Sequence, residues 1–294
     1  MDFLAHLING ISLGSIYAII ALGYTMVYGI AKMLNFAHGD VIMVGGYVIF
    51  IAVSNMGLPP VLSVILAMIL CTILGITIEK IAYKPLRNAA SSLAVLITAI
   101  GVSYLLQNAA LLIFGSNPKT FTSVVSLASI KLFDGRITIS GETIVAIISC
   151  LIIMAGLILF INKTKAGQAM LAVSEDKGAA QLMGINVNAT ISLTFAIGSA
   201  LAAVAGALLC SAYPQLTPYT GSMPGIKAFV AAVFGGIGSI PGAFIGGIIL
   251  GIIEILSKAY ISSKLSDAIV FAVLIIVLLV KPTGILGKKM QEKV

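Results

Sequence analysis

The sequence predicts an all-α membrane protein that crosses the bilayer about eight times and contains one interrupted or re-entrant helix. Hydrophobic residues make up 60% of the 294 residues, charged residues make up only 9%, and the mean hydropathy is +1.14. A soluble protein of this size could not cover so much apolar surface. Apolar runs of about 20 residues recur along the chain, and this length crosses a bilayer core as an α-helix.

Polar breaks divide the apolar sequence into predicted spans at 4–30, 37–54, 60–79, 91–114, 142–162, 188–211 and 267–281, with a Gly-rich region at 225–257. We expect the first run to be a retained membrane helix and not a signal peptide, because no basic residue precedes Lys32. The chain, 1–294, is expected to form a single transmembrane domain. It contains a polar segment at 163–187 and a longer loop at 115–141, whose composition allows a short strand pair.

Basic residues next to the spans predict how the chain is oriented, because loops rich in Lys and Arg stay in the cytoplasm. They gather in three groups: Lys80, Lys84 and Arg87; Lys163, Lys165 and Lys177; and Lys281, Lys288, Lys289 and Lys293. This predicts a cytoplasmic C-terminus and places the N-terminus and the 115–141 loop outside. The outer loop also carries basic residues, which weakens the bias without reversing it: Lys119, Lys131 and Arg136.

The last third of the chain raises a question of parity. From a cytoplasmic 163–187 to a cytoplasmic C-terminus the chain must cross an even number of times, but the full-length runs are 188–211, 241–257 and 267–281. The segment 225–237 is too short to cross alone at about 1.5 Å per residue. A half-length or re-entrant helix there resolves the count. Broken helices at membrane depth need protein or a water-filled cavity around them, so an interior pathway is predicted.

Glycines in this region are spaced by four residues: Gly238, Gly242 and Gly246, and again Gly247 and Gly251. Such spacing allows two helix backbones to approach closely. We expect tight helix packing here, with a hinge as the alternative.

Composition argues against several classes of function. The three cysteines, Cys71, Cys150 and Cys210, lie in apolar runs without CxxC spacing and are expected to be buried thiols. His6 and His38 are the only histidines, so no metal site built on several imidazoles is predicted. The net charge of +7 is explained by basic residues beside membrane spans, without nucleic acid. No catalytic constellation and no cofactor site are predicted, and a membrane enzyme is the least favoured class.

The stretch "GIAKMLNFAHGDVIMVGGY", residues 29–47, places polar groups between two apolar runs. One interpretation is an interfacial loop, in which Lys32 reaches the headgroups, Asn35 caps a helix, and His38 and Asp40 are solvated. The alternative is an interrupted helix whose polar groups face the bundle interior. Interrupted segments at corresponding places in two halves, here 29–47 and 225–247, indicate a transport site.

Longer stretches resemble a known family. "GISLGSIYAIIALGYTMVYGIAKMLNFAHGDVIMVGGYV", "GAAQLMGINV", "GIKAFVAAVFGGIGSIPGAFIGGIILGIIE" and "KPTGILG" occur in the order found in the H-type membrane permease of bacterial branched-chain amino acid ABC transporters. The resemblance covers nearly the whole chain and is weakest at 115–141. Urea and short-amide permeases share the "NFAHG" feature, so an importer of those compounds is an alternative.

The resemblance implies a type II-like ABC importer in the bacterial inner membrane. Such a system imports branched-chain amino acids and contains a second, M-type permease, two cytoplasmic ABC ATPases and an external solute-binding protein. The family pattern places "LNFAHGD" and "GGIGSIPG" as interrupted helices near the pathway. The corresponding candidate residues are Asn35, His38, Gly39, Asp40, Gly235, Gly236, Gly238 and Pro241.

Energy coupling must come from another chain, because no GxxxxGK[ST] phosphate-binding motif occurs here. The predicted receiving element is "AVSEDKGAAQLMGIN", residues 172–186, as a short helix that Ser174 caps and Gly184 ends. "AAQLMG" resembles the "EAA…G" coupling motif that docks in a cleft of the ATPase, although Gly178 stands where the motif has its first Glu. The expected coupling residues are Glu175, Asp176, Ala179, Ala180 and Gly184.

Two isolated charges remain. Glu254 fits either a pathway lining or the outer membrane boundary beside Lys258, and Lys227 is expected at the interface. Neither is expected to be a ligand, because specificity would reside mainly in the external binding protein. An ion-coupled carrier working alone would need intramembrane carboxylates in several spans, and a channel-like urea or amide facilitator is a further alternative.

Overall fold

The structure is a computed structural model that describes residues 2–87, 92–132 and 137–287. The predicted basic groups at Arg136, Lys288, Lys289 and Lys293 lie outside the described residues. The helices are α1 (Asp2–Ala31), α2 (His38–Phe50), α3 (Pro60–Ile78), α4 (Ser92–Phe114), α5 (Gly141–Lys163), α6 (Lys165–Glu175), α7 (Lys177–Leu182), α8 (Val187–Ala212), α9 (Ser222–Gly235), α10 (Ile240–Tyr260) and α11 (Ser266–Val280). π-Helical turns extend α2 and α3 at Ile51–Asn55 and Glu79–Tyr83, and a 3₁₀ turn follows at Lys84–Leu86.

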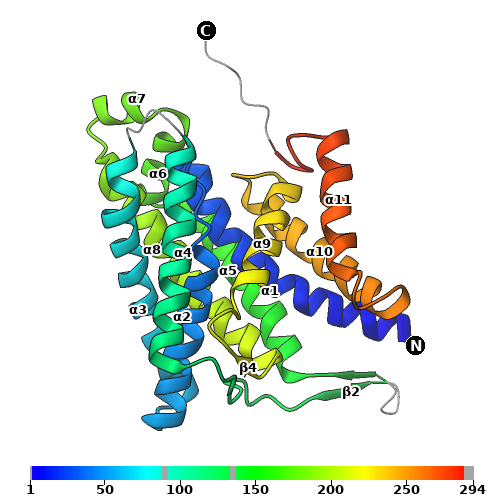
Figure 1. Cartoon of the computed structure of the whole chain (residues 1–294). Helices are drawn as coiled ribbons and strands as arrows, with labels where there is room; N and C mark the ends of the chain where they lie inside the picture. The colour runs from blue at the N-terminus through cyan, green and yellow to red at the C-terminus, as the bar shows by residue number, and fades with distance from the viewer. Residues whose placement is uncertain (1, 88–91, 133–136, 288–294) are drawn as a thin grey trace.

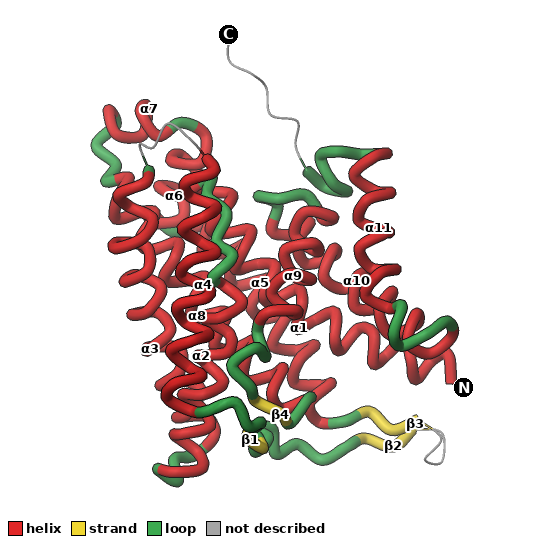
Figure 2. The backbone as a smooth tube through the Cα atoms, viewed as in Figure 1, coloured by secondary structure: helices red, strands yellow, loops and turns green. Residues whose placement is uncertain are grey.

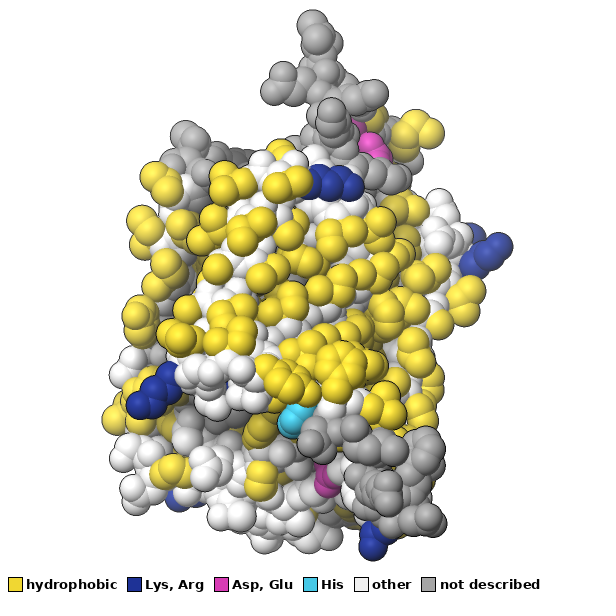
Figure 3. All heavy atoms as spheres, turned by 90° about the vertical axis from the view of Figure 1, so that its right-hand side faces the viewer, with side chains coloured by type: hydrophobic (Ala, Val, Ile, Leu, Met, Phe, Trp, Pro, Cys, Tyr) yellow, Lys and Arg dark blue, Asp and Glu magenta, His cyan; other side chains and the backbone are white. Residues whose placement is uncertain are grey.

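The chain is a multi-pass membrane protein. Among the described residues, seven helices are long and apolar enough to cross a bilayer, and α9 and α11 are shorter apolar helices. Figure 3 shows the outside of the helical layer as a broad hydrophobic band, with the visible charged side chains mainly toward its margins. The all-α prediction is confirmed, whereas the number of crossings depends on how the short helices are counted.

The two ends of the helical layer carry different elements. In Figure 1, α6, α7 and the end of α11 lie at one end of the molecule, and the β2–β3 hairpin lies at the other. The N-terminus is nearer the hairpin end. These relative positions are those predicted from the Lys and Arg distribution. We refer below to the α7 end and the hairpin end.

Two short strand pairs organise the hairpin end, as Figure 2 shows in yellow. β2 (Ile130–Leu132) pairs antiparallel with β3 (Ile137–Ile139), which confirms the strand pair expected in the 115–141 loop. β1 (Lys119–Thr120) pairs with β4 (Gln215–Leu216), which follows α8. The sequence did not predict this second pair, because each strand has only two residues and the partners are far apart in the chain.

The short helix α9 resolves the parity question. In Figure 1, α8 runs toward the hairpin end, α9 returns toward the α7 end, and α10 and α11 then run down and up. The end of α9 lies beside the last described residues, since the Ile285 and Leu286 N–H groups donate to the carbonyls of Phe234 and Gly235 at 2.9 Å each. The segment 225–237 therefore belongs to a short returning helix.

Helices α1 and α10 approach through a glycine seam. A Cβ on Gly251 would lie 2.2 Å from the Gly14 nitrogen, and one on Gly247 would lie 2.5 Å from the Ala18 Cα. Gly242 and Gly246 instead face α9, where a Cβ on Gly246 would lie 2.2 Å from the Ala231 oxygen. The spacing of four therefore serves helix packing on two faces of α10, as the sequence predicts.

Gly251→Ala is expected to lower the free energy of unfolding by about 1–3 kcal/mol, because overpacking a close contact forces the structure to shift. The atoms that the new methyl group would meet are backbone atoms of Gly14 and Gly10, which cannot move aside as a flexible side chain would. The thermal midpoint of the purified protein in detergent measures this. Gly156→Ala in α5 is the matched control, because no atom lies within 4 Å of its added Cβ. Equal midpoints for the two variants would contradict the role of the seam.

Candidate functional site

The first break in the helical layer, residues 32–37, buries the polar residues that follow it. α1 ends at Ala31, and Lys32 takes a left-handed conformation with φ +58°. After the break the chain returns beside α1 and places His38 directly against Gly23. A Cβ on Gly23 would lie 2.5 Å from His38 Nε2. His38 and Asp40 are only 1% and 2% exposed. The interfacial-loop interpretation is therefore wrong, because these side chains face protein and not solvent.

His38 is held by an aromatic neighbour on α1. Its ring meets Tyr24 edge-on at a centroid distance of 4.7 Å, and its Nε2 has no hydrogen-bond partner among the described residues. Asn35, within the break, accepts a 2.9 Å hydrogen bond from the Tyr83 hydroxyl. Tyr83 itself is fully buried in the π-helical turn after α3. Asn35 thus ties the break to α3 and does not cap a helix.

Asp40 lies in the first turn of α2 and accepts a 2.9 Å hydrogen bond from Gln107 Nε2 of α4. The same Gln107 amide nitrogen lies 3.2 Å from Ser222 Oγ of α9 and 3.3 Å from Ser103 Oγ. No Lys or Arg among the described residues pairs with Asp40 in a salt bridge. A buried carboxylate therefore meets only neutral donors where three helices converge.

Glycines allow the first turns of α2 and α9 to touch. A Cβ on Gly39 would lie 2.6 Å from the Gly221 oxygen, and a Cβ on Gly225 would lie 2.8 Å from the Gly39 Cα. No larger residue fits at this contact without moving the backbone. Gly39, predicted as part of an interrupted helix, has this packing role.

The second break, residues 236–239, separates α9 from α10. Gly236 and Gly238 have φ values of +106° and +93°, which glycine adopts without strain. Ser239 then caps α10 by accepting a 3.2 Å hydrogen bond from the Gly242 N–H, and Pro241 lies in the first turn. Gly235, at the end of α9, packs directly on the Gly242 carbonyl. All four predicted residues of "GGIGSIPG" lie at or beside this break.

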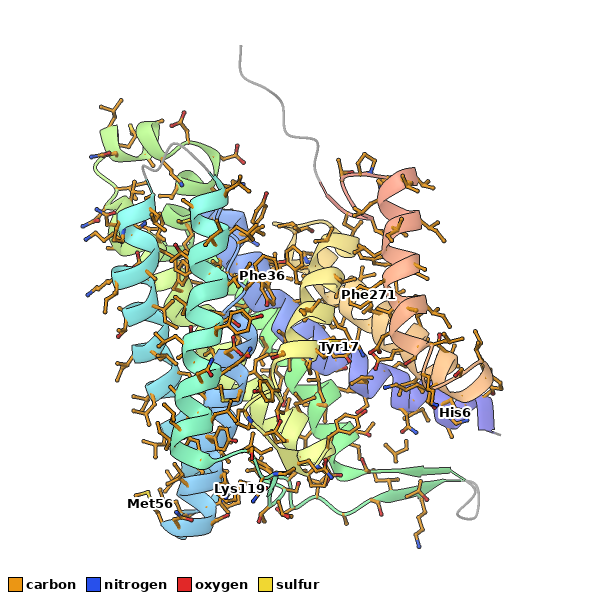
Figure 4. All side chains as sticks on the ribbon, viewed as in Figure 1. His6, Tyr17, Phe36, Met56, Lys119 and Phe271 are labelled. Atoms are coloured by element: carbon orange, nitrogen blue, oxygen red, sulfur yellow. The ribbon has the colours of Figure 1, made fainter. Side chains whose placement is uncertain are left out.

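The two breaks lie close to each other. A Cβ on Gly29, near the end of α1, would lie 3.2 Å from the Gly238 Cα. Phe36 of the first break packs against Phe229 of α9, with ring centroids 5.3 Å apart, and Figure 4 shows Phe36 near the middle of the layer. A narrow cavity between the breaks is lined by Tyr24, Tyr28, Met33, Leu34, Asn35, Phe229, Ala232 and Ile237. Residues almost 200 positions apart thus form one site.

A buried ionic network joins α1, α9, α10 and α11. Glu254 accepts from Lys227 at 2.8 Å, from Lys258 at 2.6 Å and from the Tyr17 hydroxyl at 2.9 Å, while Lys227 also pairs with Asp267 at 2.7 Å. Lys227 is 6% exposed and Glu254 is 1% exposed. Lys227 therefore lies inside the protein, whereas its expected position at the membrane interface stays a prediction. Its burial is tolerated because two carboxylates surround it.

The segment 163–187 forms two helices and not one. Asp176, not Ser174, caps α7 by accepting a 2.9 Å hydrogen bond from the Ala179 N–H, and Ser174 belongs to α6. Gly184 follows α7 with φ +82°, as predicted for a helix end. The sequence interpretation placed the start two residues early because Ser174 and Asp176 are both good caps.

The outer surface of α7 is exposed and apolar near its end. Leu182 is 90% exposed and Met183 is 83% exposed, and both follow the exposed Ala179. Ala180, in contrast, is only 3% exposed and packs against its own protein. Ala180, one of the expected coupling residues, is therefore not part of the exposed surface of α7. Glu175, Asp176 and Gly184 are exposed on the same segment.

Lys177, the first residue of α7, contacts the end of α1. Its Nζ donates a 3.0 Å hydrogen bond to the Ala31 carbonyl, directly before the first break. Partial burial lowers the pKa of the Lys177 ammonium, and the nearby positive charges of Arg87 and Lys32 lower it further. This contact joins the exposed surface at the α7 end to the first break.

A family model described as "Branched-chain amino acid transport system / permease component" matches residues 6–278. The chain belongs to this permease family. The permease is 48% identical to the high-affinity branched-chain amino acid transport system permease protein LivH of Salmonella typhimurium, covering 99% of this chain and 98% of that protein.

More distant relatives carry similar names. The permease is 45% identical to BraD of Pseudomonas aeruginosa, with 99% and 98% coverage, and 31% identical to a probable LivH of Methanocaldococcus jannaschii, with 93% and 89% coverage. A solved structure, PsaBC from Streptococcus pneumoniae in complex with Fab, is similar at 14% identity and a TM-score of 0.45, covering 96% of this chain and 91% of that chain.

The sequence interpretation missed three contacts in the permease. They are made by Gln107, Ser222 and Lys177. Gln107 is a polar residue inside an apolar run, which is a signal that could have found it. Ser222 and Lys177 stand beside glycines and other polar residues, and only their contacts in the structure distinguish them. Among the described residues, no group of three or more His, Cys, Asp or Glu side chains could hold a metal ion.

Proposed function

We propose that this chain is a membrane permease subunit of an ATP-driven importer of branched-chain amino acids in the bacterial inner membrane. The contact between the two helix breaks, 32–37 and 236–239, carries the proposal, because irregular backbone at membrane depth is tolerated where it lines a pathway. The relatives that are 45–48% identical over nearly their full length support the cargo class by their names.

The proposed pathway residues are those of the two breaks and the first turn of each following helix. They are Asn35, His38, Gly39, Asp40, Gly235, Gly236, Gly238 and Pro241. The whole chain would act as one transmembrane domain, with 115–141 as an external loop. The basic residues at the α7 end favour a cytoplasmic location for that end and for the C-terminus. A second, M-type permease would complete the pathway, and an external solute-binding protein would deliver the amino acid.

The energy would come from two cytoplasmic ABC ATPases that dock on the segment 163–187. In this proposal Leu182, Met183 and Ala179 form the apolar part of the docking surface, with Glu175 and Asp176 beside it for basic groups of the ATPase. Closure of the ATPases on ATP would move α7. The Lys177–Ala31 hydrogen bond would pass this movement to α1 and the first break, so that the site alternates between outward and inward openings.

The test is uptake by proteoliposomes that contain the permease, its partner subunits and the solute-binding protein. Labelled leucine is expected to be taken up only when ATP is present on the side of the membrane where the ATPases lie. Labelled urea is not expected to be taken up. Uptake of urea in preference to leucine would indicate the related urea or amide importers. Uphill uptake by this chain alone, without nucleotide, would contradict the proposal in favour of a secondary carrier.

A further inference from the structure

We infer that Asp40, Gln107 and Ser222 form a transient site for the ammonium group of the transported amino acid. The inference rests on the proposed function and adds to it the group of the cargo that is recognised inside the membrane. Its basis is a buried carboxylate on α2 that has no salt-bridge partner among the described residues and lies among neutral hydrogen-bonding groups of α4 and α9.

The first step is the geometry of the three side chains. Asp40 comes from the first turn of α2, Gln107 from α4, and Ser222 is the first residue of α9. Gln107 Nε2 lies 2.9 Å from Asp40 Oδ1 and 3.2 Å from Ser222 Oγ, so one amide spans the distance between the carboxylate and the hydroxyl. Gly221, the N-cap of α9, and Gly225 in its first turn both touch Gly39, which brings Ser222 close to the start of α2.

The second step is the charge balance. The basic side chains that lie inside or beside the layer bond elsewhere: Lys227 and Lys258 to Glu254, Arg87 to Glu79, and Lys177 to the Ala31 carbonyl. Asp40 instead lies at the positive ends of two helices, its own α2 and the adjoining α9. Helix ends favour a nearby carboxylate but contribute only about half a unit charge each. The carboxylate is thus kept in place, and within the described part of the chain no fixed cation neutralises it.

The third step is the fit to an amino acid. An ammonium group donates three hydrogen bonds, and an ionised carboxylate has about four acceptor positions, of which Gln107 and Ser103 each use one here. Ser222 offers a hydroxyl acceptor beside it. Ile226 lies one turn after Ser222 on α9, is 42% exposed, and would meet an aliphatic cargo side chain.

The fourth step is access. Asp40 is buried, but Ser103 of α4 and Ser222 of α9, the two hydroxyl partners of Gln107, are each partly exposed. The hydrogen-bonded chain therefore leads from the carboxylate toward the surface between these two helices. A small movement of α9 against α2 would open the site, because the two helices touch there through the small glycines Gly39, Gly221 and Gly225. An amino acid held by one charge pair can dissociate again, which transport across the membrane requires.

The test compares three variants in proteoliposomes that contain the complete importer. Asp40→Asn keeps the size of the side chain but removes its charge. It is expected to lower the maximal rate of leucine uptake at least about tenfold, the range of a lost hydrogen bond to a charged group. Isoleucine and valine uptake should fall by the same factor, because the three cargoes share the ammonium group. Glu142→Gln is the matched control, since Glu142 is also a carboxylate in a first helical turn, that of α5.

The double variant Asp40→Asn with Gln107→Glu separates a charge effect from a structural one. It moves the carboxylate to the other end of a 2.9 Å hydrogen bond, and it is expected to restore most of the uptake rate. Co-purification of the partner subunits and the thermal midpoint report assembly of each variant. Three results would each overturn the site. The first is wild-type uptake by Asp40→Asn, and the second is a double variant that is no faster than the single variant. The third is an unequal loss of uptake among leucine, isoleucine and valine. If the unmodified importer takes up no leucine, the proposed function itself fails.

Discussion

Replacing Leu182 and Met183 together with glutamate is expected to prevent docking of the ATPase and to abolish uptake. These side chains are 90% and 83% exposed at the end of α7, although both are large and apolar. In a protein interface such side chains fill a pocket, and loss of a central contact costs about 2 kcal/mol or more, which is roughly 30-fold in affinity. Co-purification of the ATPase with the permease, followed by leucine uptake in proteoliposomes, measures the two effects.

Leu127→Glu provides the matched control for this prediction. Leu127 is an exposed leucine as well, at 55%, but it lies in the loop that leads to the β2–β3 hairpin at the opposite end of the molecule. The control should retain both the ATPase and uptake. An unchanged amount of bound ATPase in the Leu182/Met183 variant would remove α7 from the docking surface. Ala180 is unsuitable for this test, because a larger residue there would disturb the packing of α7 itself.

Lys177→Met is expected to leave the ATPase bound but to reduce the amount of leucine transported per ATP hydrolysed. The substitution keeps most of the apolar stem and removes the hydrogen bond to the Ala31 carbonyl. Hydrogen bonds to charged groups contribute about 1.5–3 kcal/mol, so that a loss of about tenfold or more in this ratio is expected. Uptake and phosphate release measured in the same proteoliposomes give the ratio.

Lys165→Met is the control for Lys177→Met. Lys165 is the first residue of α6, as Lys177 is of α7, and it is exposed. Lys177→Arg should restore part of the ratio, because a guanidinium can still donate to the carbonyl. If Lys177→Met transports as much leucine per ATP as the unmodified permease, the hydrogen bond to α1 does not carry the movement. A loss of bound ATPase would indicate that Lys177 belongs to the docking surface instead.

The sequence predicted the helices well because their apolar runs have the length that a bilayer requires. Every predicted span corresponds to a helix whose ends differ from the prediction by a few residues, apart from the Gly-rich region, which divides into α9 and α10. That division was also expected, since 225–237 is too short to cross alone. Hydropathy does not show which helices α9 contacts. The contact between the first turns of α9 and α2 could therefore not be predicted from the sequence.

The candidate site was only partly predictable. "LNFAHGD" and "GGIGSIPG" stood out as polar or glycine-rich interruptions, and both are breaks between helices. Sequence patterns gave no information about the partners across the bundle, such as Gln107 for Asp40 and Tyr83 for Asn35, because these pairs are 67 and 48 residues apart. The burial of Lys227 within the protein was not predicted for the same reason. Burial of a charge depends on counterions that lie on other helices.

The hydrogen bonds from Ile285 and Leu286 to the end of α9 have a consequence for membrane insertion of the growing chain. The last carbonyls of a helix lack partners within the helix, and here two of them are satisfied by residues close to the C-terminus. While the ribosome is still synthesising α11, the end of α9 therefore lacks these two donors. The turn between α9 and α10 can reach its final hydrogen bonding only after residues 285 and 286 have been made and have folded back onto α9.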